Sequence, residues 1–400
     1  MMSMKLSIVI VLTIALSGCS WFKLNGDEDV REPFKLESIT KEVDAKQLWS
    51  TKVGKGADDK AIRLVPAISG SRIFAAAADG TIKALQLDSG REIWRVQVRD
   101  VYSKGEQENA FSKEVDAITG GVGVNDDQLA VGTAAGEIVV LNQSDGSLAW
   151  RARTSSELLA PPQLDAEIAV THSIDGKISA FNVLDGERLW TYSTDVPSLT
   201  LRGTTTPIVT PEYIVAGFAS GRFALLNRKT GIAGFDLPIS VAQGRSDLER
   251  LVDIDGAMAI VGARLYVVGY QGSLIAVNLN NAQVEWGHEA SSVVGIGEGF
   301  GNVYLASENS ALSAYDAISG KVLWEVDALT YRDITTPVTA SSFVVVGDSD
   351  GYLHIIAQSD GRFVGRRKVD GKGLYSAAVT NGKLVYILGK SGILSAYEIR

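Results

Sequence analysis

Apolar and polar residues alternate along most of the chain in short runs that end at turn residues. Four such runs occur early in the chain, at residues 65–68, 72–77, 81–87 and 91–98. Alternation with a period of two residues predicts half-buried β-strands. The dipeptides Asp79-Gly80 and Ser89-Gly90 separate the last three runs and are typical of tight hairpin turns, in which φ is positive. This segment therefore predicts a four-stranded antiparallel sheet.

The same pattern recurs along the rest of the chain. Six segments align on a turn residue, an alternating run, a second turn and an aromatic residue, which falls fourteen positions after the first turn residue, as from Gly80 to Trp94. The six aromatic residues are Trp94, Trp150, Trp190, Phe235, Trp286 and Trp324. A seventh copy, which begins at Gly351, lacks the aromatic residue. Repeats of roughly 40–50 residues that each predict four strands indicate a β-propeller with one sheet per blade.

The two ends of the chain together supply an eighth blade. The copy that begins at Gly392 stops at Arg400, before its last strand, and residues 47–53 contain Trp49 in the local context of the other copies. A ring closed by strand exchange explains both fragments and leaves few exposed sheet edges. No helical periodicity separates the strands, which argues against a mixed α/β fold. We predict an all-β protein: one eight-bladed β-propeller of four-stranded antiparallel blades over residues 46–400, closed by an N-terminal strand, with Trp49 and the six other aromatic residues packed between blades.

The first nineteen residues predict a targeting signal. Lys5 precedes a mostly apolar run, residues 6–16, which is too short to span a bilayer as a helix, since that requires about 20 residues. A signal peptide over residues 1–18, removed from the mature protein, fits this pattern. The ending Leu-Ser-Gly-Cys19 contains the only cysteine and resembles the lipobox of bacterial lipoproteins, which implies lipid attachment to Cys19. We expect residues 19–45 to form the lipidated N-terminus and a polar tether.

Composition and charge exclude one class of partner. The chain of 400 residues is 46% hydrophobic and 21% charged, as in ordinary globular proteins, and its net charge is −9. Nucleic-acid binding requires clustered Lys and Arg, so we expect no nucleic-acid partner. An acidic protein also has no electrostatic reason to adhere to anionic lipid, so membrane attachment is expected through the lipid anchor alone.

The repeat carries a family resemblance. Its pattern, as in the segment ALQLDSGREIW at residues 84–94, resembles the propeller repeat of proteins related to pyrroloquinoline-quinone (PQQ) enzymes. Together with the lipobox and the chain length, it resembles the BamB family, the propeller lipoproteins of the outer-membrane β-barrel assembly (BAM) machine. The resemblance implies a non-enzymatic scaffold at the outer membrane, facing the periplasm, that assists folding and insertion of β-barrel proteins. It also implies binding to the POTRA domains of a BamA-like protein and to other BAM subunits, with nascent outer-membrane proteins as a further candidate partner.

Two loops match the segments with which BamB proteins bind the POTRA domains, namely residues 195–203 and 249–255. Both are expected to cross from the outer strand of one blade to the inner strand of the next, and such crossovers emerge on the same face of a propeller. Leucine anchors and arginines are suited to a binding hot spot, and the aspartates are suited to pairing with a basic partner or fixing the arginines from behind. The candidate partner-binding residues are Leu199, Leu201, Arg202, Arg250, Asp253 and Asp255. In the alternative interpretation the leucines fill a local core and the aspartates cap turns.

Two other functional classes remain as alternatives. A PQQ-dependent dehydrogenase shares the repeat, but such enzymes resemble longer chains with Ca²⁺ ligands and often adjacent cysteines. A periplasmic receptor for nascent barrel strands would use exposed strand edges, with the insertion at residues 99–117 as either a binding surface or a flexible loop.

The apparent catalytic motifs do not fit an enzyme. The sequence Gly347-Asp-Ser-Asp-Gly351 matches a nucleophile elbow but falls at a blade hairpin and precedes no helix. His172, His288 and His354 fall in three different blades without the spacing of metal ligands. We therefore expect no catalytic residue, no metal and no cofactor.

The lipobox generates a direct prediction. Cys19→Ser leaves the propeller folded but releases it from the membrane, because the lipid and not the protein body holds it there. Membrane fractionation in cells that lack the protein partners measures this. A mutant that still sediments quantitatively with outer membrane contradicts the lipoprotein interpretation.

Overall fold

The computed structural model describes residues 31–102 and 117–400. The proposed signal peptide, Cys19 and most of the 99–117 insertion lie outside these ranges. Pro33–Arg400 forms one compact unit. Within the described ranges, no helix has the length and apolar character needed to cross a membrane.

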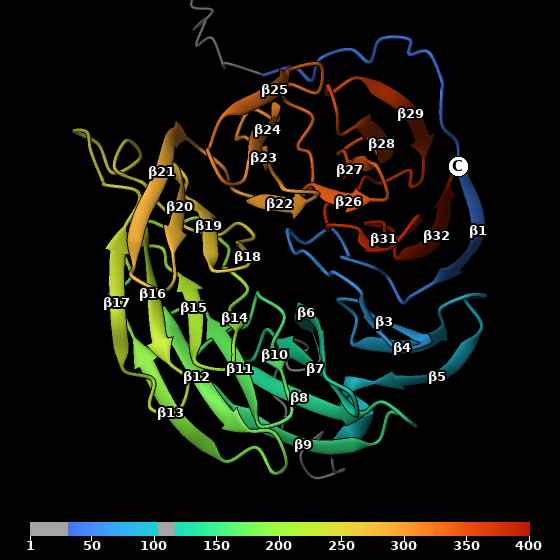
Figure 1. Cartoon of the computed structure of the whole chain (residues 1–400). Helices are drawn as coiled ribbons and strands as arrows, with labels where there is room; N and C mark the ends of the chain where they lie inside the picture. The colour runs from blue at the N-terminus through green and yellow to red at the C-terminus, as the bar shows by residue number, and fades with distance from the viewer. Residues whose placement is uncertain (1–30, 103–116) are drawn as a thin grey trace, which may run out of the picture. The chain divides into compact units, whose positions relative to one another are not determined.

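The unit consists of eight four-stranded antiparallel sheets arranged as a ring, coloured in chain order in Figure 1. The first four blades follow one another along the chain. Blade 1 contains β2 (Ala67–Ser69), β3 (Arg72–Ala76), β4 (Thr81–Gln86) and β5 (Glu92–Gln97), and is followed by a short 3₁₀ helix, η1 (Val98–Val101). Blade 2 contains β6 (Ile118–Val124), β7 (Gln128–Thr133), β8 (Glu137–Asn142) and β9 (Leu148–Arg153). Blade 3 contains β10 (Gln163–Leu164), β11 (Ile168–Ser173), β12 (Lys177–Asn182) and β13 (Arg188–Ser193). Blade 4 contains β14 (Ile208–Val209), β15 (Tyr213–Gly217), β16 (Arg222–Asn227) and β17 (Ala233–Pro238).

The remaining four blades complete the ring. Blade 5 contains β18 (Ala259–Val261), β19 (Arg264–Val268), β20 (Gly272–Asn278) and β21 (Gln283–Ala290). Blade 6 contains β22 (Ile296–Gly299), β23 (Asn302–Ala306), β24 (Leu312–Asp316) and β25 (Val322–Val326). Blade 7 contains β26 (Val338–Ala340), β27 (Phe343–Gly347), β28 (Tyr352–Ala357) and β29 (Phe363–Lys368). Blade 8 joins β30 (Val379–Asn381), β31 (Leu384–Leu388) and β32 (Ile393–Ile399) to β1 (Ala45–Lys52).

Burial differs between the strands of each blade. The two middle strands are buried almost throughout, as in β4, whereas the outer strand β5 is mostly exposed or half-buried. Strands covered on both faces by neighbouring sheets are expected to be almost continuously apolar, and outer strands to alternate. The core is therefore distributed around the ring between adjacent sheets.

Strand β1 closes the ring as the sequence predicts. It pairs antiparallel with β32, from Ala45 opposite Ile399 to Lys52 opposite Ile393. The strand begins at Ala45, two residues before the start predicted from the residues around Trp49. The expected all-β, eight-bladed architecture with an N-terminal closing strand is confirmed.

Tryptophans join adjacent blades by the same interaction around most of the ring. The indole N–H on an outer strand donates to a carbonyl at the end of the third strand of the next blade, as from Trp324 Nε1 to Gln358 O at 2.8 Å. The other five pairs are Trp49 with Leu87, Trp94 with Gln143, Trp150 with Val183, Trp190 with Arg228 and Trp286 with Ala317. Each interaction combines burial of a large aromatic surface with a satisfied polar group.

The hairpin turn that receives each indole ring requires glycine. Gly361 has a φ of +76°, and a Cβ there would lie 2.8 Å from the Trp324 ring. The exception is informative. Phe235 replaces tryptophan in blade 4, and the corresponding turn of blade 5 carries Ala282, still at a φ of +56°. The smaller ring leaves room for the methyl group.

Every outer strand contains a β-bulge directly before the aromatic position. In each blade the register with the third strand shifts there by one residue, which leaves one residue of the outer strand without a cross-strand partner. The bulge residues of blades 1 to 8 are Ile93, Ala149, Leu189, Gly234, Glu285, Leu323, Val364 and Leu48. A bulge increases the local twist and redirects side chains, here the aromatic residue toward the next blade.

Residues 33–44, termed the strap, pack on the propeller instead of forming part of a solvated tether. The strap runs outside β29 before it enters β1, as the blue trace in Figure 1 shows. The N–H of Phe34 donates to Thr330 O at 2.9 Å, and Glu42 and Val43 donate to Val364 O at 2.9 and 3.0 Å. Val43 packs on the core between blades 7 and 8. The tether expectation for residues 19–45 therefore does not describe residues 33–44, because these residues have backbone and apolar partners.

The strap also explains why the seventh repeat lacks an aromatic residue. Blade 8 has no hairpin between its third and fourth strands, since the chain ends at Arg400 and β1 comes from the other terminus. An indole on blade 7 would therefore have no turn to receive it. Gly365 occupies the aromatic position, and a Cβ there would lie 2.7 Å from Val43 O.

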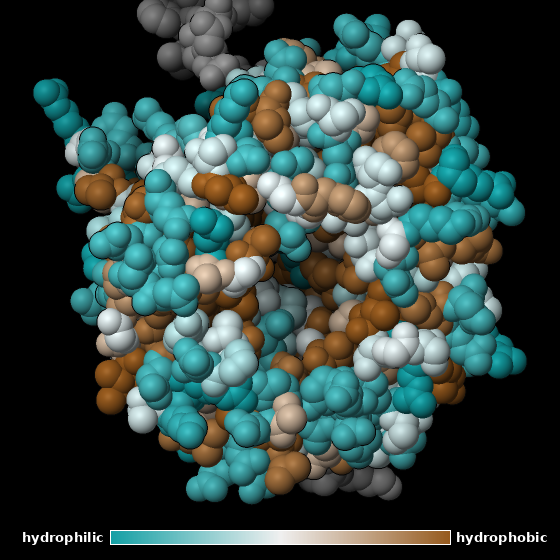
Figure 2. All heavy atoms as spheres, viewed as in Figure 1, coloured by the Kyte–Doolittle hydropathy of each residue, from teal (hydrophilic) through white to brown (hydrophobic). Residues whose placement is uncertain are grey.

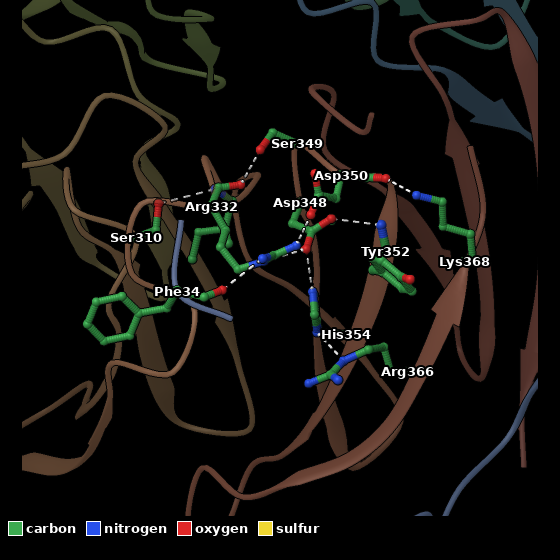
Figure 3. A network of polar contacts seen from close by, with 12 residues as sticks. Phe34, Ser310, Arg332, Asp348, Ser349, Asp350, Tyr352, His354, Arg366 and Lys368 are labelled. Carbon is green, nitrogen blue, oxygen red and sulfur yellow. Dashed lines mark hydrogen bonds and ion pairs between the residues drawn. The ribbon is translucent and has the colours of Figure 1, made fainter. Parts of the chain in front are cut away.

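A buried polar network holds the start of the strap (Figure 3). The guanidinium of Arg332 donates to Asp348 at 2.8 Å, to Asp350 at 2.5 Å and to Phe34 O at 2.9 Å. Burial lowers the pKa of His354, and Arg366 Nε donates to its Nδ1 at 3.2 Å. The neutral ring therefore donates from Nε2 to Asp348, at 2.9 Å. His354 and the turn that matches a nucleophile elbow thus have a structural role.

The strap contacts generate a prediction about truncation. Relative to a chain that starts at Pro33, a chain that starts at Ala45 loses about 2 kcal/mol of unfolding free energy, because the apolar contacts and hydrogen bonds that disappear outweigh the conformational entropy that the strap loses on folding. A chain that starts at Val53 also lacks β1 and is destabilised much more. Denaturant unfolding of the three chains measures both steps, and equal midpoints for the first two contradict a stabilising strap.

Candidate docking site

The two candidate loops lie side by side on one face of the propeller. One connects β13 to β14 and contains residues 194–207, and the other connects β17 to β18 and contains residues 239–258. Both run from an outer strand to the inner strand of the next blade. The N–H of Leu201 donates to Asp253 Oδ2 at 3.1 Å, and Thr205 donates to Ile254 O, so the loops are joined directly.

Asp253 and Asp255 support the first loop from within the protein. Asp253 is 1% exposed and also accepts the N–H of Ile254 at 2.8 Å. Asp255 lies against the backbone of Gly203, where a Cβ would be 2.2 Å from its carboxylate oxygen. The segment Leu201-Arg202-Gly203 thus has a carboxyl group at each end, bonded to the backbone at Leu201 and in close contact at Gly203.

The two carboxyl groups share a low-dielectric environment. Burial, followed by the negative charge of Asp255, raises the pKa of Asp253 to about 8. Burial raises the pKa of Asp255 to about 6, and the positive charge of Arg63 opposes this rise. Two negative charges are costly at short separation in such surroundings, so the pair favours protonation of one of its carboxyl groups.

The two candidate arginines are exposed and paired with acidic residues. One terminal nitrogen of Arg202, Nη2, donates to both carboxylate oxygens of Glu157, at 2.9 and 2.8 Å. Glu157 lies in the neighbouring crossover. Arg250 lies 3.3 Å from Asp247. Arg202 thus has one acidic partner within the protein, while about half of its side chain remains exposed.

Residues 241–250 form an exposed loop with its own internal structure, and every residue in it is exposed. Glu249 accepts the N–H groups of Arg245 and Ser246 at 2.7 and 3.1 Å, which lowers the pKa of Glu249. Ser246 Oγ in turn accepts the N–H of Glu249 at 3.2 Å. Such reciprocal capping fixes a turn that carries the exposed side chain of Leu248.

Apolar side chains are exposed on both loops. The exposed fractions are 38% for Val196, 42% for Leu199, 62% for Val241 and 68% for Leu248. Each loop thus contains two exposed apolar residues and an exposed arginine. Apolar groups and arginine on a rigid framework are the composition of a protein–protein hot spot.

The sequence-predicted residues divide into two groups. Leu199, Arg202 and Arg250 are exposed and available to a partner, and Leu201 is half-buried. Asp253 is buried, so it is not placed to pair with a basic partner, and Asp255 is half-buried. Neither aspartate fixes Arg202 or Arg250, because the arginines pair with Glu157 and Asp247. Asp253 instead accepts backbone N–H groups, as in the alternative interpretation of a structural role.

Sequence reasoning missed Val196, Val241 and Leu248. Two features of the sequence could have indicated them. Each is an apolar residue in an otherwise polar crossover, and Leu248 lies within the capping pattern Ser246-x-x-Glu249.

The inner strands of the blades lie close together around the axis of the propeller. Figure 2 shows a hollow at the centre of the ring with many apolar residues in view. Inner strands approach one another closely there, so a Cβ at Gly123 would lie 1.7 Å from Pro162 O and one at Gly297 2.0 Å from Pro337 O. Among residues 31–102 and 117–400, no group of three or more His, Cys, Asp or Glu side chains is arranged to hold a metal.

Comparison with solved structures shows that several functions share this fold. BamB from Moraxella catarrhalis matches with a TM-score of 0.78 and 24% identity, over 89% of this chain and all of that one. Quinohemoprotein alcohol dehydrogenase from Comamonas testosteroni matches with a TM-score of 0.68 and 13% identity, over 90% of this chain and 76% of that one. Identities this low show the fold alone.

Sequence comparison is more specific. The family model described as outer membrane protein assembly factor BamB matches residues 39–106, 78–326 and 299–400. Proteins named outer membrane protein assembly factor BamB are 35% identical in Pseudomonas aeruginosa, over the full length of both chains, and 33% identical in Yersinia pestis, over 97% of each. The Escherichia coli protein of the same name is 34% identical over 94% of each chain. The chain therefore belongs to the BamB family of outer membrane protein assembly factors.

Proposed function

We propose that this protein is a lipid-anchored, non-enzymatic scaffold that binds the POTRA domains of a BamA-like protein through the two crossovers and thereby assists insertion of β-barrel proteins into the outer membrane. Lipid on Cys19 would hold it at the outer membrane on the periplasmic side, within a complex that contains other BAM subunits. The family's name supports membership of the assembly machinery and an association with the outer membrane. The binding surface and the anchor are inferred from the resemblance of residues 195–203 and 249–255 to segments of BamB proteins and of residues 16–19 to a lipobox.

One observation carries the docking proposal: exposed apolar side chains project from loops that the protein has already ordered. The Ser246–Glu249 capping holds Leu248, and the aspartate pair holds the loop that carries Leu199 and Arg202. A loop ordered before binding loses less conformational entropy when the complex forms. More of the free energy gained by burying the exposed apolar groups is therefore available for binding.

The aspartate pair contributes to binding indirectly in this proposal. Asp253 and Asp255 face the loop backbone, so they position Leu201 and Arg202 and do not themselves meet the partner. Their substitution changes the presentation of the loop, and it also changes stability, because Asp253 is buried.

The dehydrogenase alternative depends on a fold shared at 13% identity, and no residue of the described site favours it. Absorbance of the purified protein after incubation with PQQ and Ca²⁺ tests it directly. Saturable binding of the quinone with one equivalent per chain supports the alternative.

Exposed anchors predict binding losses without instability. Leu199→Ala and Arg202→Ala each weaken binding of purified POTRA domains by about 30-fold or more, since truncation of a hot-spot residue typically costs about 2 kcal/mol or more of binding free energy. The melting temperature stays within about 2 °C of wild type, because both side chains are substantially exposed. Calorimetric titration and thermal unfolding measure the two quantities.

Leu184→Ala is the matched control for this pair. Leu184 is 78% exposed at the hairpin between β12 and β13, at the opposite end of the blade from the crossovers. Leu184→Ala should leave both the affinity for POTRA domains and the melting temperature unchanged. Equal effects at Leu184 and Leu199 would move the docking surface elsewhere.

The carboxyl pair predicts a pH dependence. Both pKa values are raised in the folded state, so the folded protein binds more protons than the unfolded chain between about pH 4 and 8. The pair's contribution to stability is therefore complete at low pH and is lost as pH rises through the folded pKa values, by at most about 1.4 kcal/mol per pH unit for each group. Asp255→Asn removes the neighbouring charge, lowers the pKa of Asp253 and flattens this slope. Unfolding free energies between pH 5 and 8 measure the slope, and parallel curves for wild type and variant contradict a coupled pair.

A further inference from the structure

Arg63 lies in the crossover that leads from β1 to β2, at residues 53–66. Figure 1 shows the segment that precedes β3 in blue, reaching toward the middle of the ring. The neighbours Ile62 and Leu64 are 4% and 2% exposed and belong to the apolar core around blade 1. Arg63 itself is exposed. Buried neighbours thus fix the backbone on either side, while the guanidinium extends out of this core.

The guanidinium of Arg63 contacts the crossover of a distant blade. It donates from Nη1 to Val293 O at 3.0 Å, between residues 230 positions apart. Val293 lies between β21 and β22, in the crossover from blade 5 to blade 6. The hydrogen bond therefore links two parts of the ring that are not neighbours and that no sheet joins.

The segment that Arg63 contacts is bonded directly to the second docking loop. The N–H of Ala257 donates to Val294 O, next to the carbonyl that Arg63 binds, at 3.0 Å. Gly256 approaches Gly295 so closely that a Cβ at Gly256 would lie 2.3 Å from the nitrogen of Gly295. The two backbone segments thus form one unit, and Arg63 is bonded to one side of it.

Asp255 joins this unit to the loop that carries Leu199 and Arg202. It directly precedes Gly256, and its carboxylate lies so close to Gly203 that a Cβ there would be 2.2 Å from it. Burial raises the pKa of Asp255, and the positive charge of Arg63 opposes this rise, so the two side chains interact electrostatically. Arg63 therefore acts on residue 255 in two ways, by its charge and through the backbone of the residues that follow.

We propose that Arg63 is a positioning residue for the docking site, which it holds in the binding conformation from across the ring by fixing Asp255 and the backbone next to it. This inference rests on the proposed function, because it concerns the same site. A loop held in its binding conformation loses less entropy when the partner binds. Removal of Arg63 takes a positive charge away from two neighbouring carboxyl groups, Asp253 and Asp255, and the support of the first loop changes with them.

A purely structural role for Arg63 predicts a different pattern. A hydrogen bond that only stabilised the ring would affect the melting temperature and leave POTRA affinity unchanged in a folded variant. Since Arg63 is exposed, its substitution opens no cavity in the core, and the melting temperature should fall by no more than about 3 °C. Affinity and stability can therefore be measured separately.

Two substitutions in the otherwise intact protein test the proposal. Arg63→Met removes the charge and the hydrogen bond, and should weaken binding of purified POTRA domains about fivefold. This effect is smaller than that of Arg202→Ala because Arg63 does not meet the partner. Arg63→Lys keeps the charge and should restore most of the affinity. Arg91→Met is the matched control, at an exposed arginine in the hairpin between β4 and β5, and should leave the affinity unchanged.

Titration of Asp255 in the free protein supplies a measurement that needs no partner. Followed by the carboxyl carbon resonance, its titration midpoint should rise by about one pH unit in Arg63→Met, because a nearby positive charge favours the ionised form. Arg63→Lys should leave the midpoint near that of wild type. In an Asp255→Asn background, Arg63→Met should change POTRA affinity by less than about twofold, since the residue through which it acts has lost its charge.

The outcomes separate this proposal from the docking proposal. An Asp255 midpoint that is equal in wild type and Arg63→Met overturns the role of Arg63. Wild-type POTRA affinity of Arg63→Met also overturns it, provided that Leu199→Ala weakens binding. If Leu199→Ala itself binds as wild type does, the docking site is wrong and the role of Arg63 in docking falls with it, whereas the Asp255 midpoint still reports the contact between Arg63 and that carboxylate.

Discussion

Contact between neighbouring blades through a tryptophan and a glycine is the interaction on which the rest of the structure depends. A single four-stranded blade exposes two apolar faces and cannot be stable alone. The indole of one blade covers the turn of the next and donates to its carbonyl, so each blade is fixed against its neighbour in orientation as well as in distance. Six such contacts and one phenylalanine contact join the blades in sequence, and the strap substitutes for the eighth.

A rigid ring of this kind explains how crossover loops can act as a binding surface. The loops at residues 194–207 and 239–258 belong to different blades, and their relative position depends on the contact between those blades. Trp190 on blade 3 fixes the start of the first loop, and Phe235 on blade 4 fixes the start of the second. The aspartate pair then joins the loops to each other. The contacts that stabilise the fold thus also position the loops of the candidate site.

The sequence was sufficient for the fold because its signals are repeated. Alternation of period two, turn glycines and an aromatic residue at constant spacing reinforce one another in copy after copy, and the incomplete copy at each terminus indicates ring closure. The strap was not predictable in the same way. Residues 33–44 are polar in composition and occur once, and their contacts are mainly backbone hydrogen bonds to residues more than 280 positions away, which no local pattern records.

The candidate site was predictable in location but not in detail. Leu199 and Arg202 are exposed as expected, yet Asp253 is buried because two backbone donors and a second carboxyl group satisfy it. Charge in a loop normally indicates exposure, and only the fold reveals that these aspartates point inward. Leu248 was not predicted as a binding residue, because its fixed position depends on the hydrogen bonds that Glu249 accepts from the backbone. A pattern of apolar residues does not show such bonds.

The pairing of β1 with β32 has a consequence for the order in which the protein folds. Ala45 pairs with Ile399, so the ring cannot close until the segment that contains Ile399 is available to β1. Until then β1 has no partner, and neither does the strap next to it. Blades 1 to 7 form from segments contiguous in sequence and can assemble one after another, while the final step joins the two ends of the polypeptide. A chain that lacks β32 cannot pair β1 and is left with an open sheet edge, which favours pairing with other chains.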